Sequence, residues 1–354
     1  MDEQKKSSAL SEVAGVEGQS SINPNLSHFK HKRQREDSTS LVERMRKGDR
    51  SALSRAITIV ESTRPADYPL ADELVTACLP HSGKSIRIGI TGVPGVGKST
   101  FIERFGRQWI EKGHKVAVLA VDPSSAKTGG SILGDKTRMN LLSQEEDAFI
   151  RPSPSAGSLG GVARKTRESI ILCEAAGYDI IIIETVGVGQ SEISVKRMVD
   201  LFVLLLLPGA GDELQGIKRG IMEMADVIFL NKADSGQERK AQLAAGEVRR
   251  ALKLYPEDPR GWTVPVQPIS AMDGTGLPEA LDEIEKFQRH MTLKGHWDQL
   301  RSEQAAWWFD DTVGEFLKAH WFAQEDKKAA YQAALKSVST GEMSPLAAAR
   351  KLFS

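Results

Sequence analysis

Between residues 82 and 290, short apolar runs alternate with segments in which apolar residues recur every three or four positions. Runs of the first kind are typical of strands buried on both faces of a parallel sheet, and the second pattern is typical of amphipathic helices. The alternation predicts a three-layer α/β fold with a mostly parallel sheet and ligands at the carboxyl ends of its strands. The predicted strands are Ile86 to Thr91, Lys115 to Val121, Ala148 to Arg151, Ile180 to Glu184, Leu201 to Leu207, Val227 to Asn231 and Val264 to Ile269. Helices are predicted between them, among others over Lys98 to Lys112, Ala163 to Ala176 and Gln237 to Leu254.

Helical patterns flank this core on both sides. Residues 38–81 predict three short helices, the second capped by Asp49 and the third following Pro65 and Pro69. Residues 291–354 predict further helices, the last beginning at Ser344-Pro345. They carry an aromatic and apolar stripe that is typical of a core or subunit interface, although a ligand pocket is an alternative: Trp297, Trp307, Trp308, Phe309, Phe316, Leu317, Trp321 and Phe322.

Composition narrows the class of protein. The 354 residues carry no net charge, which disfavours a dedicated nucleic-acid surface. No apolar run is long enough to span a bilayer and the start of the chain lacks a signal-peptide pattern, so we expect a cytoplasmic protein. Cys78 and Cys173 are isolated and predict buried thiols. The polar residues 1–37 predict a disordered tail.

The strongest motif follows the first predicted strand. It fits the phosphate-binding loop G-x-x-x-x-G-K-[ST] and has the strand before it and the helix after it that this loop needs. Its glycines let backbone N–H groups turn toward an anion, and the helix amino terminus adds positive potential. The expected nucleotide-binding residues are Gly92, Val93, Pro94, Gly95, Val96, Gly97, Lys98, Ser99 and Thr100. Lys98 would reach the terminal phosphates as a catalytic residue, and Ser99 would ligate Mg²⁺.

Acidic residues follow two of the buried strands. Asp122 and Glu184 each stand at a strand end, and Asp135 lies in a loop between them. Together with Ser99 they predict a Mg²⁺ shell, because this ion prefers a few carboxylates beside phosphate oxygens and water. As alternatives, Asp122 could cap a turn before Pro123 and Asp135 could cap a helix.

Glu184 also opens the pattern Glu184-x-x-Gly187, in which a backbone N–H senses the γ-phosphate. Val188 stands where Ras-type enzymes have the glutamine that orients the attacking water, and a valine cannot do so. The sequence therefore predicts slow intrinsic hydrolysis that a partner completes. Gln190 and Glu192 are the local candidates for a catalytic role.

The base is predicted to bind after the sixth strand. Asn231-Lys232-Ala233-Asp234 fits N-K-x-D, in which the aspartate accepts from the ring N–H and the amino group of guanine. Adenine would leave that carboxylate unpaired, which is costly in a buried site. Ser270, Ala271 and Met272 follow the seventh strand, and Ser270-Ala271 fits the element whose backbone N–H contacts the guanine carbonyl oxygen. The predicted ligands are therefore GTP and GDP with Mg²⁺.

These motifs together resemble GTPases of the SIMIBI class of P-loop proteins, and more narrowly the MeaB/ArgK subfamily, whose animal member is MMAA. Three long stretches carry the resemblance, which covers the chain from about Ser40 onward: residues 121–139, 184–192 and 209–218. By this resemblance residues 122–139 are switch I, residues 184–192 are switch II, and residues 209–220, with Asp212, Glu213 and Lys218, are a third switch. The third segment could instead be an ordinary loop between a strand and a helix.

The resemblance implies a GTP-hydrolysing chaperone of an adenosylcobalamin-dependent acyl-CoA mutase, most often methylmalonyl-CoA mutase. Such proteins gate cofactor loading, protect or reactivate the mutase, and form homodimers through the C-terminal helices. The sequence pattern as a whole predicts four segments: the tail 1–37, which lies outside the resemblance, an N-terminal helical segment 38–81, the P-loop GTPase domain 82–290 and a C-terminal helical region 291–354, which the resemblance makes the dimerisation region. Metal delivery is disfavoured because no His-rich or Cys-rich cluster is present. The alternative function is that of a small-molecule kinase or an NTPase linked to amino-acid transport.

Overall fold

The computed structural model describes residues 37–121, 139–152, 159–185, 191–209 and 219–353. Contacts within the chain divide it between Asp37 and Ser38, and residues from Ser38 onward form one compact unit. The predicted tail 1–37 lies outside the described residues except for Asp37, and so do most of the residues that carry the predicted switches.

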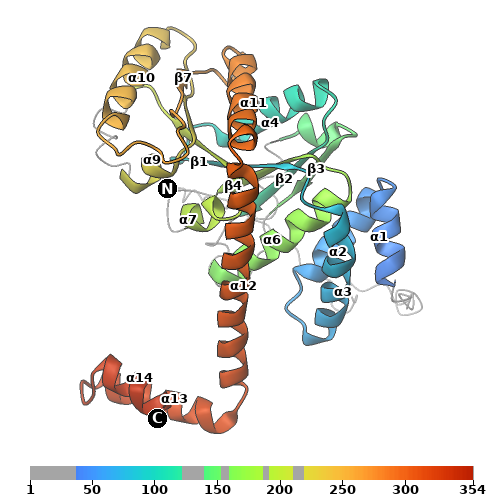
Figure 1. Ribbon diagram of the computed structural model, residues 1–354, viewed down its shortest axis with the longest axis vertical. Coiled ribbons are helices and arrows are strands. Elements are labelled where there is room, and N and C mark those ends of the chain that lie inside the picture. Colours follow the sequence, from blue (N-terminus) through green and yellow to red (C-terminus); the bar gives the residue numbers. More distant parts are fainter. Residues whose placement is uncertain (1–36, 122–138, 153–158, 186–190, 210–218, 354) are drawn as a thin grey trace, which may run out of the picture. The chain divides into compact units, whose positions relative to one another are not determined.

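A seven-stranded sheet forms the centre of this unit, and every pair of neighbouring strands is parallel (Figure 1). The strand order is β3-β2-β4-β1-β5-β6-β7, which confirms the predicted three-layer α/β fold. The strands are β1 (Ile86–Gly92), β2 (Val116–Val121), β3 (Ala148–Arg151), β4 (Ile180–Thr185), β5 (Leu201–Leu206), β6 (Val227–Leu230) and β7 (Val266–Pro268). β7 is shorter than predicted because it is an edge strand preceded by Pro265 and ending at Pro268, and neither proline can donate a backbone hydrogen bond.

Helices cover both faces of the sheet. One apolar layer packs α6 (Leu159–Ala175), α7 (Ser191–Lys196), α9 (Arg219–Met224) and α10 (Glu238–Leu252) against one face. The other face is covered by α4 (Lys98–Glu111) and α11 (Leu277–Leu293), whose Phe101, Phe105 and Phe287 are fully buried. Burial on both faces explains why the strands are continuous apolar runs rather than alternating ones.

Three N-terminal helices, α1 (Ser38–Arg46), α2 (Arg50–Val60) and α3 (Tyr68–Cys78), pack against α6. Asp49 caps α2 as predicted, since its carboxylate accepts from the N–H groups of Ser51 and Ala52. Short 3-10 turns lie at Pro65–Asp67, Leu79–His81 and Leu142–Gln144. Both thiols are buried, as the sequence predicted, and burial raises the pKa of Cys78 to about 11.

Aspartates cap the amino edge of the sheet in a repeated arrangement. Asp179, Asp200 and Asp226 each directly precede a strand and accept the backbone N–H of a residue that lies on, or directly before, the neighbouring strand. The acceptor distances are 2.8 Å to Lys115, 2.8 Å to Arg87 and 2.8 Å to Phe202, respectively. Each aspartate returns its own N–H to the carbonyl of that residue. Two hydrogen bonds at each aspartate therefore join the amino ends of neighbouring strands.

Helix α12 (His296–Phe322) crosses this edge from one face of the sheet to the other. Trp297 and Leu300 pack against the apolar layer of α4 and α11, whereas Trp308 packs against that of α6 and α7. Between them, Arg301 binds both carboxylate oxygens of Asp200, at 2.5 and 2.6 Å. The helix is therefore anchored on the capped edge itself.

The anchored helix is tied to two further elements. Gln304 donates to the carbonyl of Val199 at 2.7 Å, and Arg167 of α6 pairs with Asp311 at 2.9 Å. Beyond it lie α13 (Glu325–Ser339) and α14 (Pro345–Phe353). Trp321, near the end of α12, contacts Tyr331 of α13 and Phe353 of α14. None of the described helices combines the length and apolar character needed to cross a membrane.

The caps differ in burial, which gives a graded stability prediction. The Asp200 side chain is fully buried and binds the largely buried Arg301 guanidinium through both oxygens, so Asp200→Ala removes the close counter-ion of Arg301 and should cost about 3–5 kcal/mol. Asp179 makes the same backbone contact, but its side chain is 46% exposed, so Asp179→Ala should cost about 1 kcal/mol. Urea unfolding measures both free energies. Equal losses would show that burial of the carboxylate does not govern the strength of the cap.

Candidate nucleotide-binding site

The phosphate loop joins β1 to α4 at the carboxyl edge of the sheet. Gly97 precedes the first residue of α4, Lys98, so the amino terminus of a 14-residue helix opens at the loop. The Lys98 ammonium group donates to the carbonyl of Gly92 at 2.8 Å, which folds the side chain back over the loop. This curled loop with a lysine across it has the form of an anion-binding cradle.

Two glycines of the loop cannot be replaced without a clash. A Cβ atom at Gly92 would lie 2.6 Å from the carbonyl oxygen of Leu205. A Cβ atom at Gly97 would lie 2.7 Å from the side-chain nitrogen of Asn231, and Gly97 also has a positive φ of 95°. The glycine positions of the motif are thus explained by the close approach of β5 and of the loop after β6.

Ser99 and Glu184 meet beside this loop. The Ser99 hydroxyl donates to the Glu184 carboxylate at 3.4 Å, although the two residues are 85 positions apart. Glu184 is 6% exposed and ends β4 together with Thr185. A hydroxyl and a carboxylate are oxygen donors of the kind that Mg²⁺ takes alongside phosphate and water, so the residues present fit this ion. Among the described residues no group of three or more His, Cys, Asp or Glu side chains forms a closed metal site.

Asn231, the first residue after β6, links the phosphate loop to the loop after β7, which is here called the guanine loop. Its amide nitrogen donates to the carbonyl of Val96 at 2.8 Å, and its amide oxygen accepts from the N–H of Ala271 at 2.9 Å. Asn231 is 1% exposed, so both bonds are shielded from water. A contact from the Ala271 N–H to a guanine carbonyl would have to share the hydrogen that Asn231 now accepts.

Asp234 is aligned by the loop after β7. The Ser270 hydroxyl donates to the Asp234 carboxylate at 2.5 Å and accepts from the N–H of Asp273 at 3.2 Å. The Thr275 N–H, which donates to Asp273, lowers the pKa of that carboxyl. Sequence reasoning assigned a backbone contact to Ser270 and missed its hydroxyl as the group that orients Asp234.

Lys232 lies in a strained backbone conformation between these residues. Its φ of 64° is in the left-handed region, which residues other than glycine enter at a cost of about 1–3 kcal/mol. The turn is held from the other side by the Ala233 N–H, which donates to the carbonyl of Ile269 at 3.0 Å. The Lys232 and Met272 side chains are exposed on this surface, where the base is predicted to lie.

The remaining predicted site residues are placed as follows. Glu192 is in the first turn of α7 and is 1% exposed, so its carboxyl group faces the protein interior in this structure. The rest lie outside the described residues: Asp122, Asp135, Gly187, Gln190, Asp212, Glu213 and Lys218. Their roles stay predictions.

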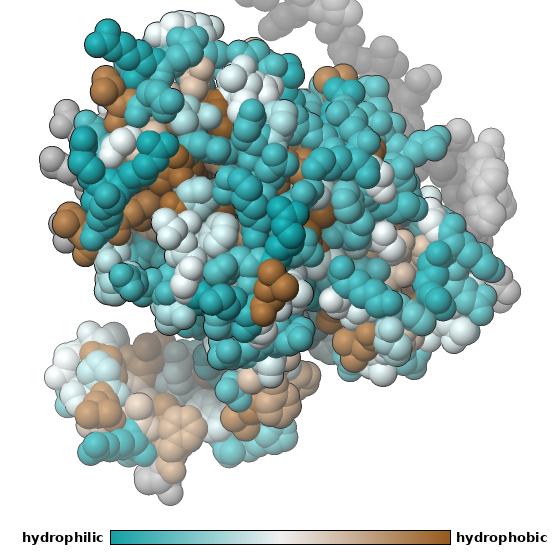
Figure 2. All heavy atoms as spheres, turned by 45° about the horizontal axis from the view of Figure 1, so that its top comes forward, coloured by the Kyte–Doolittle hydropathy of each residue, from teal (hydrophilic) through white to brown (hydrophobic). Residues whose placement is uncertain are grey.

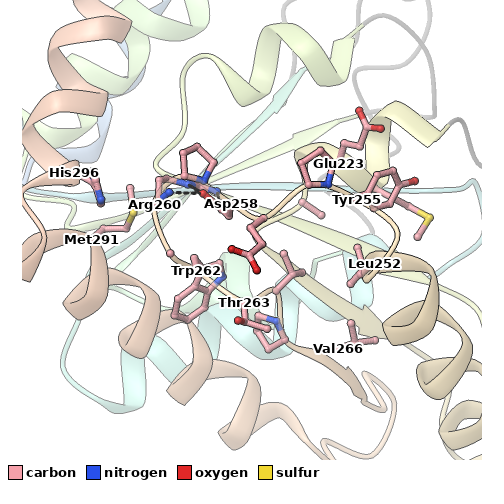
Figure 3. Close-up of a pocket in the computed structure, with 18 of the residues that line it drawn as sticks. Glu223, Leu252, Tyr255, Asp258, Arg260, Trp262, Thr263, Val266, Met291 and His296 are labelled. Atoms are coloured by element: carbon pink, nitrogen blue, oxygen red, sulfur yellow. Dashed lines mark hydrogen bonds and ion pairs between the residues drawn. The ribbon is translucent and has the colours of Figure 1, made fainter.

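A separate open cleft of about 1470 Å³ lies near the amino end of β6 (Figure 3). Its wall includes Trp262, Tyr255 and the ion pair of Arg260 with Asp258, drawn as a dashed line in Figure 3. None of the described residues of the phosphate or guanine loops lines this cleft. Arg260 in the wall of the cleft pairs with Asp226, which lies at the amino edge of the sheet. The phosphate loop and the loops after β6 and β7 lie at the opposite, carboxyl edge, so the cleft is not the nucleotide site.

Comparison with known proteins decides the family. The model of the family described as methylmalonyl Co-A mutase-associated GTPase MeaB matches residues 53–326. The chain belongs to the MeaB family. The resemblance predicted from the three long stretches of sequence is therefore confirmed, and the chain is a P-loop GTPase.

Relatives in several organisms agree with this assignment. A probable GTPase of Mycobacterium tuberculosis is 50% identical over 314 residues, which cover 88% of this chain and 93% of the relative. The GTPase ArgK of Escherichia coli is 46% identical over 88% of this chain and 94% of its own length. The mouse methylmalonic aciduria type A homolog, which is mitochondrial, is 46% identical over 87% of this chain and 76% of its own length.

A solved structure supports the fold. The crystal structure of a protein named LAO/AO transport system kinase superposes with a TM-score of 0.72 at 39% identity. The match covers 89% of this chain and 96% of that one. The similarity therefore extends over most of both chains.

The alignment of Asp234 gives a prediction of nucleotide choice. Asp234→Asn replaces an acceptor pair by one acceptor and one donor, so guanine loses a partner and xanthine, which has a carbonyl in place of the amino group, gains one. We expect GTP affinity to fall roughly 10- to 100-fold and the affinity for xanthosine triphosphate to rise. Ser270→Ala, which frees the Asp234 carboxylate without changing it, should weaken GTP binding by less and leave xanthosine triphosphate excluded. Titration with fluorescent nucleotide analogues measures both, and an unchanged preference in Asp234→Asn would remove Asp234 from base recognition.

Proposed function

We propose that this protein hydrolyses GTP slowly and serves as a chaperone of an adenosylcobalamin-dependent acyl-CoA mutase, with methylmalonyl-CoA mutase as the first candidate. The observation that carries the nucleotide part is the Asn231 bridge, which joins a phosphate cradle to a loop with an aligned carboxylate. The observation that supports the partner is membership of a family named for its association with methylmalonyl-CoA mutase.

Bound GTP would be held at its two ends by different loops. Lys98 would exchange the Gly92 carbonyl for the terminal phosphates, and the backbone N–H groups of the loop would surround them. Ser99 and Glu184 would hold Mg²⁺, with Asp122 and Asp135 as further candidates. The ion would supply neutralisation of the charge that develops on the phosphate oxygens.

Completion of the hydrolytic site is assigned to the partner complex. Val188 cannot orient water, and Glu192 is buried in α7. A rearrangement that brings Gln190 or Glu192 to the γ-phosphate would therefore accelerate hydrolysis, and binding of the mutase can favour that rearrangement if it binds one state better than the other. Residues Asp212, Glu213 and Lys218 of the predicted third switch are our candidates for sensing the mutase.

The distal half of α12 presents an apolar surface that suits a second copy of the chain. Phe309, Val313, Phe316 and Leu317 follow a helical spacing of three or four and are exposed, while Trp308 and Asp311 of the same helix contact Arg197 and α6. Figure 2 shows further apolar side chains over the C-terminal helices. A continuous exposed apolar stripe is typical of a subunit interface, so we propose that the protein is a homodimer through these helices.

Nucleotide turnover distinguishes the proposed function from the kinase alternative. We expect slow release of GDP and phosphate from GTP, a severalfold rise on addition of stoichiometric methylmalonyl-CoA mutase, and no turnover of ATP. Phosphate release and chromatography of the products measure these. An unchanged rate with the mutase would contradict this partner, and a phosphorylated small molecule formed in proportion to the GTP consumed would favour a kinase.

A charge placed on the apolar stripe tests the dimer. Phe316→Glu buries a carboxylate at the proposed interface, which should raise the dimer dissociation constant at least about 100-fold, the equivalent of about 3 kcal/mol. Leu254→Glu, at a position that is 87% exposed after α10, is the matched control and should leave the association unchanged. Sedimentation velocity across a range of concentrations reads out both. A monomeric unmodified protein at all concentrations would contradict the proposal.

A further inference from the structure

Two threonine hydroxyls meet at the carboxyl edge of the sheet, between the strands that lead into the nucleotide site. The Thr185 hydroxyl donates to the Thr91 hydroxyl at 2.9 Å and lies 3.4 Å from the carbonyl of Ile90. Both side chains are 0% exposed. One is the last residue of β4 and the other the penultimate residue of β1, and neither belongs to the motif positions that bind nucleotide.

The position of this pair in the sheet is informative. The backbone register between β1 and β4 ends with Ile90 opposite Glu184, one residue before the threonines. Beyond that point β1 continues to pair with β5, and β4 continues to pair with β2, where Val121 lies opposite Thr185. The hydroxyl bond therefore links the two strands just past the point where their backbone pairing stops.

The groups on either side of this link are those that would hold the nucleotide and its ion. Gly92, the first residue of the phosphate loop, directly follows Thr91, and Glu184 directly precedes Thr185. Successive side chains of a strand point to opposite faces, so Glu184 reaches Ser99 on the α4 face while Thr185 points to the α7 face. The distance between Ser99 and Glu184 depends on how far apart the ends of β1 and β4 lie.

Packing alone does not require hydroxyl groups here. The same face of the sheet carries the fully buried apolar side chains of Ile181, Ile183 and Phe202, while its buried ion pair of Arg87 with Glu174 lies toward the amino ends of the strands. Valine has the shape of threonine and an equal or better strand preference, and an apolar pair would avoid the cost of burying two hydroxyls. What the hydroxyls add is a directional link of fixed length between the two strand ends.

We propose that the bond between Thr185 and Thr91 is a positioning contact that holds Glu184 at the distance from Ser99 at which both reach a nucleotide-bound Mg²⁺. This inference rests on the proposed role of Glu184 toward Mg²⁺ and adds two residues that act through it. Neither threonine touches the substrate in this assignment.

The test combines valine and serine variants. Thr185→Val, Thr91→Val and the double variant remove the bond but keep the shape, and Thr185→Ser keeps the hydroxyl. Thr312→Val, which removes a hydroxyl bond of 2.7 Å to the carbonyl of Trp308 in α12, is the matched control. The readout is the dissociation rate of a fluorescent GDP analogue as a function of free Mg²⁺, measured beside kcat, KM and the urea unfolding midpoint.

We expect each valine variant to raise the Mg²⁺ concentration needed to retain the nucleotide by roughly 2- to 10-fold, the equivalent of one neutral hydrogen bond. The double variant should not exceed the larger single effect, because both substitutions remove the same bond. Thr185→Ser and Thr312→Val should stay within about twofold of the unmodified protein.

A shift in the unfolding midpoint with unchanged Mg²⁺ dependence would overturn the inference, as would additive effects of the two valine substitutions. The variant Glu184→Gln distinguishes failure of the positioning role of the threonines from failure of the proposed role of Glu184 toward Mg²⁺. If Glu184→Gln changes the Mg²⁺ dependence and the valine variants do not, the positioning role alone is wrong. If Glu184→Gln leaves it unchanged, the assignment of Glu184 to the ion is wrong and the inference is wrong with it.

Discussion

The amide group of Asn231 is the contact on which the nucleotide site depends. Its two polar ends bind Val96 in the phosphate loop and Ala271 in the guanine loop, and the side chain is almost fully buried. Two loops that would otherwise be positioned only by the strands they follow are thus fixed to each other. In the proposed function the phosphates and the base bind to different loops, so a fixed distance between these loops would itself select the nucleotide.

At the opposite edge of the sheet, the amino edge, charged side chains hold neighbouring strands and α12 in place. There Asp179, Asp200 and Asp226 lock neighbouring strands, and Arg301 anchors α12 on the most central of the three. Buried charges of this kind contribute little net stability compared with apolar side chains, but an incorrectly paired charge is costly. The network therefore favours one placement of α12, which carries the proposed dimer surface.

The two edges are connected through α6 and α7. Trp308 donates to the carbonyl of Arg197, directly after α7, and the Arg197 guanidinium lies 4.7 Å from the ring centre of Trp307. Since α7 begins in the predicted switch II and ends next to this contact, the C-terminal helices hold one end of a helix whose other end belongs to that predicted switch. A partner bound to the C-terminal helices and a partner bound to the predicted switches would therefore both act on α7.

The sequence by itself determined the layers of the fold, all seven strands and the family, because buried parallel strands and phosphate loops are local patterns that need no knowledge of distant contacts. It also placed Asp49 as a cap and both cysteines in the core, for the same reason. The contacts that tertiary structure alone decided join residues far apart in the chain: Ser99 with Glu184, Asn231 with Val96, Ser270 with Asp234, and Thr185 with Thr91. Each depends on which strands become neighbours and on which face a side chain points to, and a strand order of β3-β2-β4-β1-β5-β6-β7 cannot be read from the order of the strands along the chain. An acidic residue directly before a buried apolar strand indicates that its carboxylate needs a partner, because an unpaired buried charge is costly. The sequence could not show that the partner of Asp200 would be Arg301, which is 101 positions away.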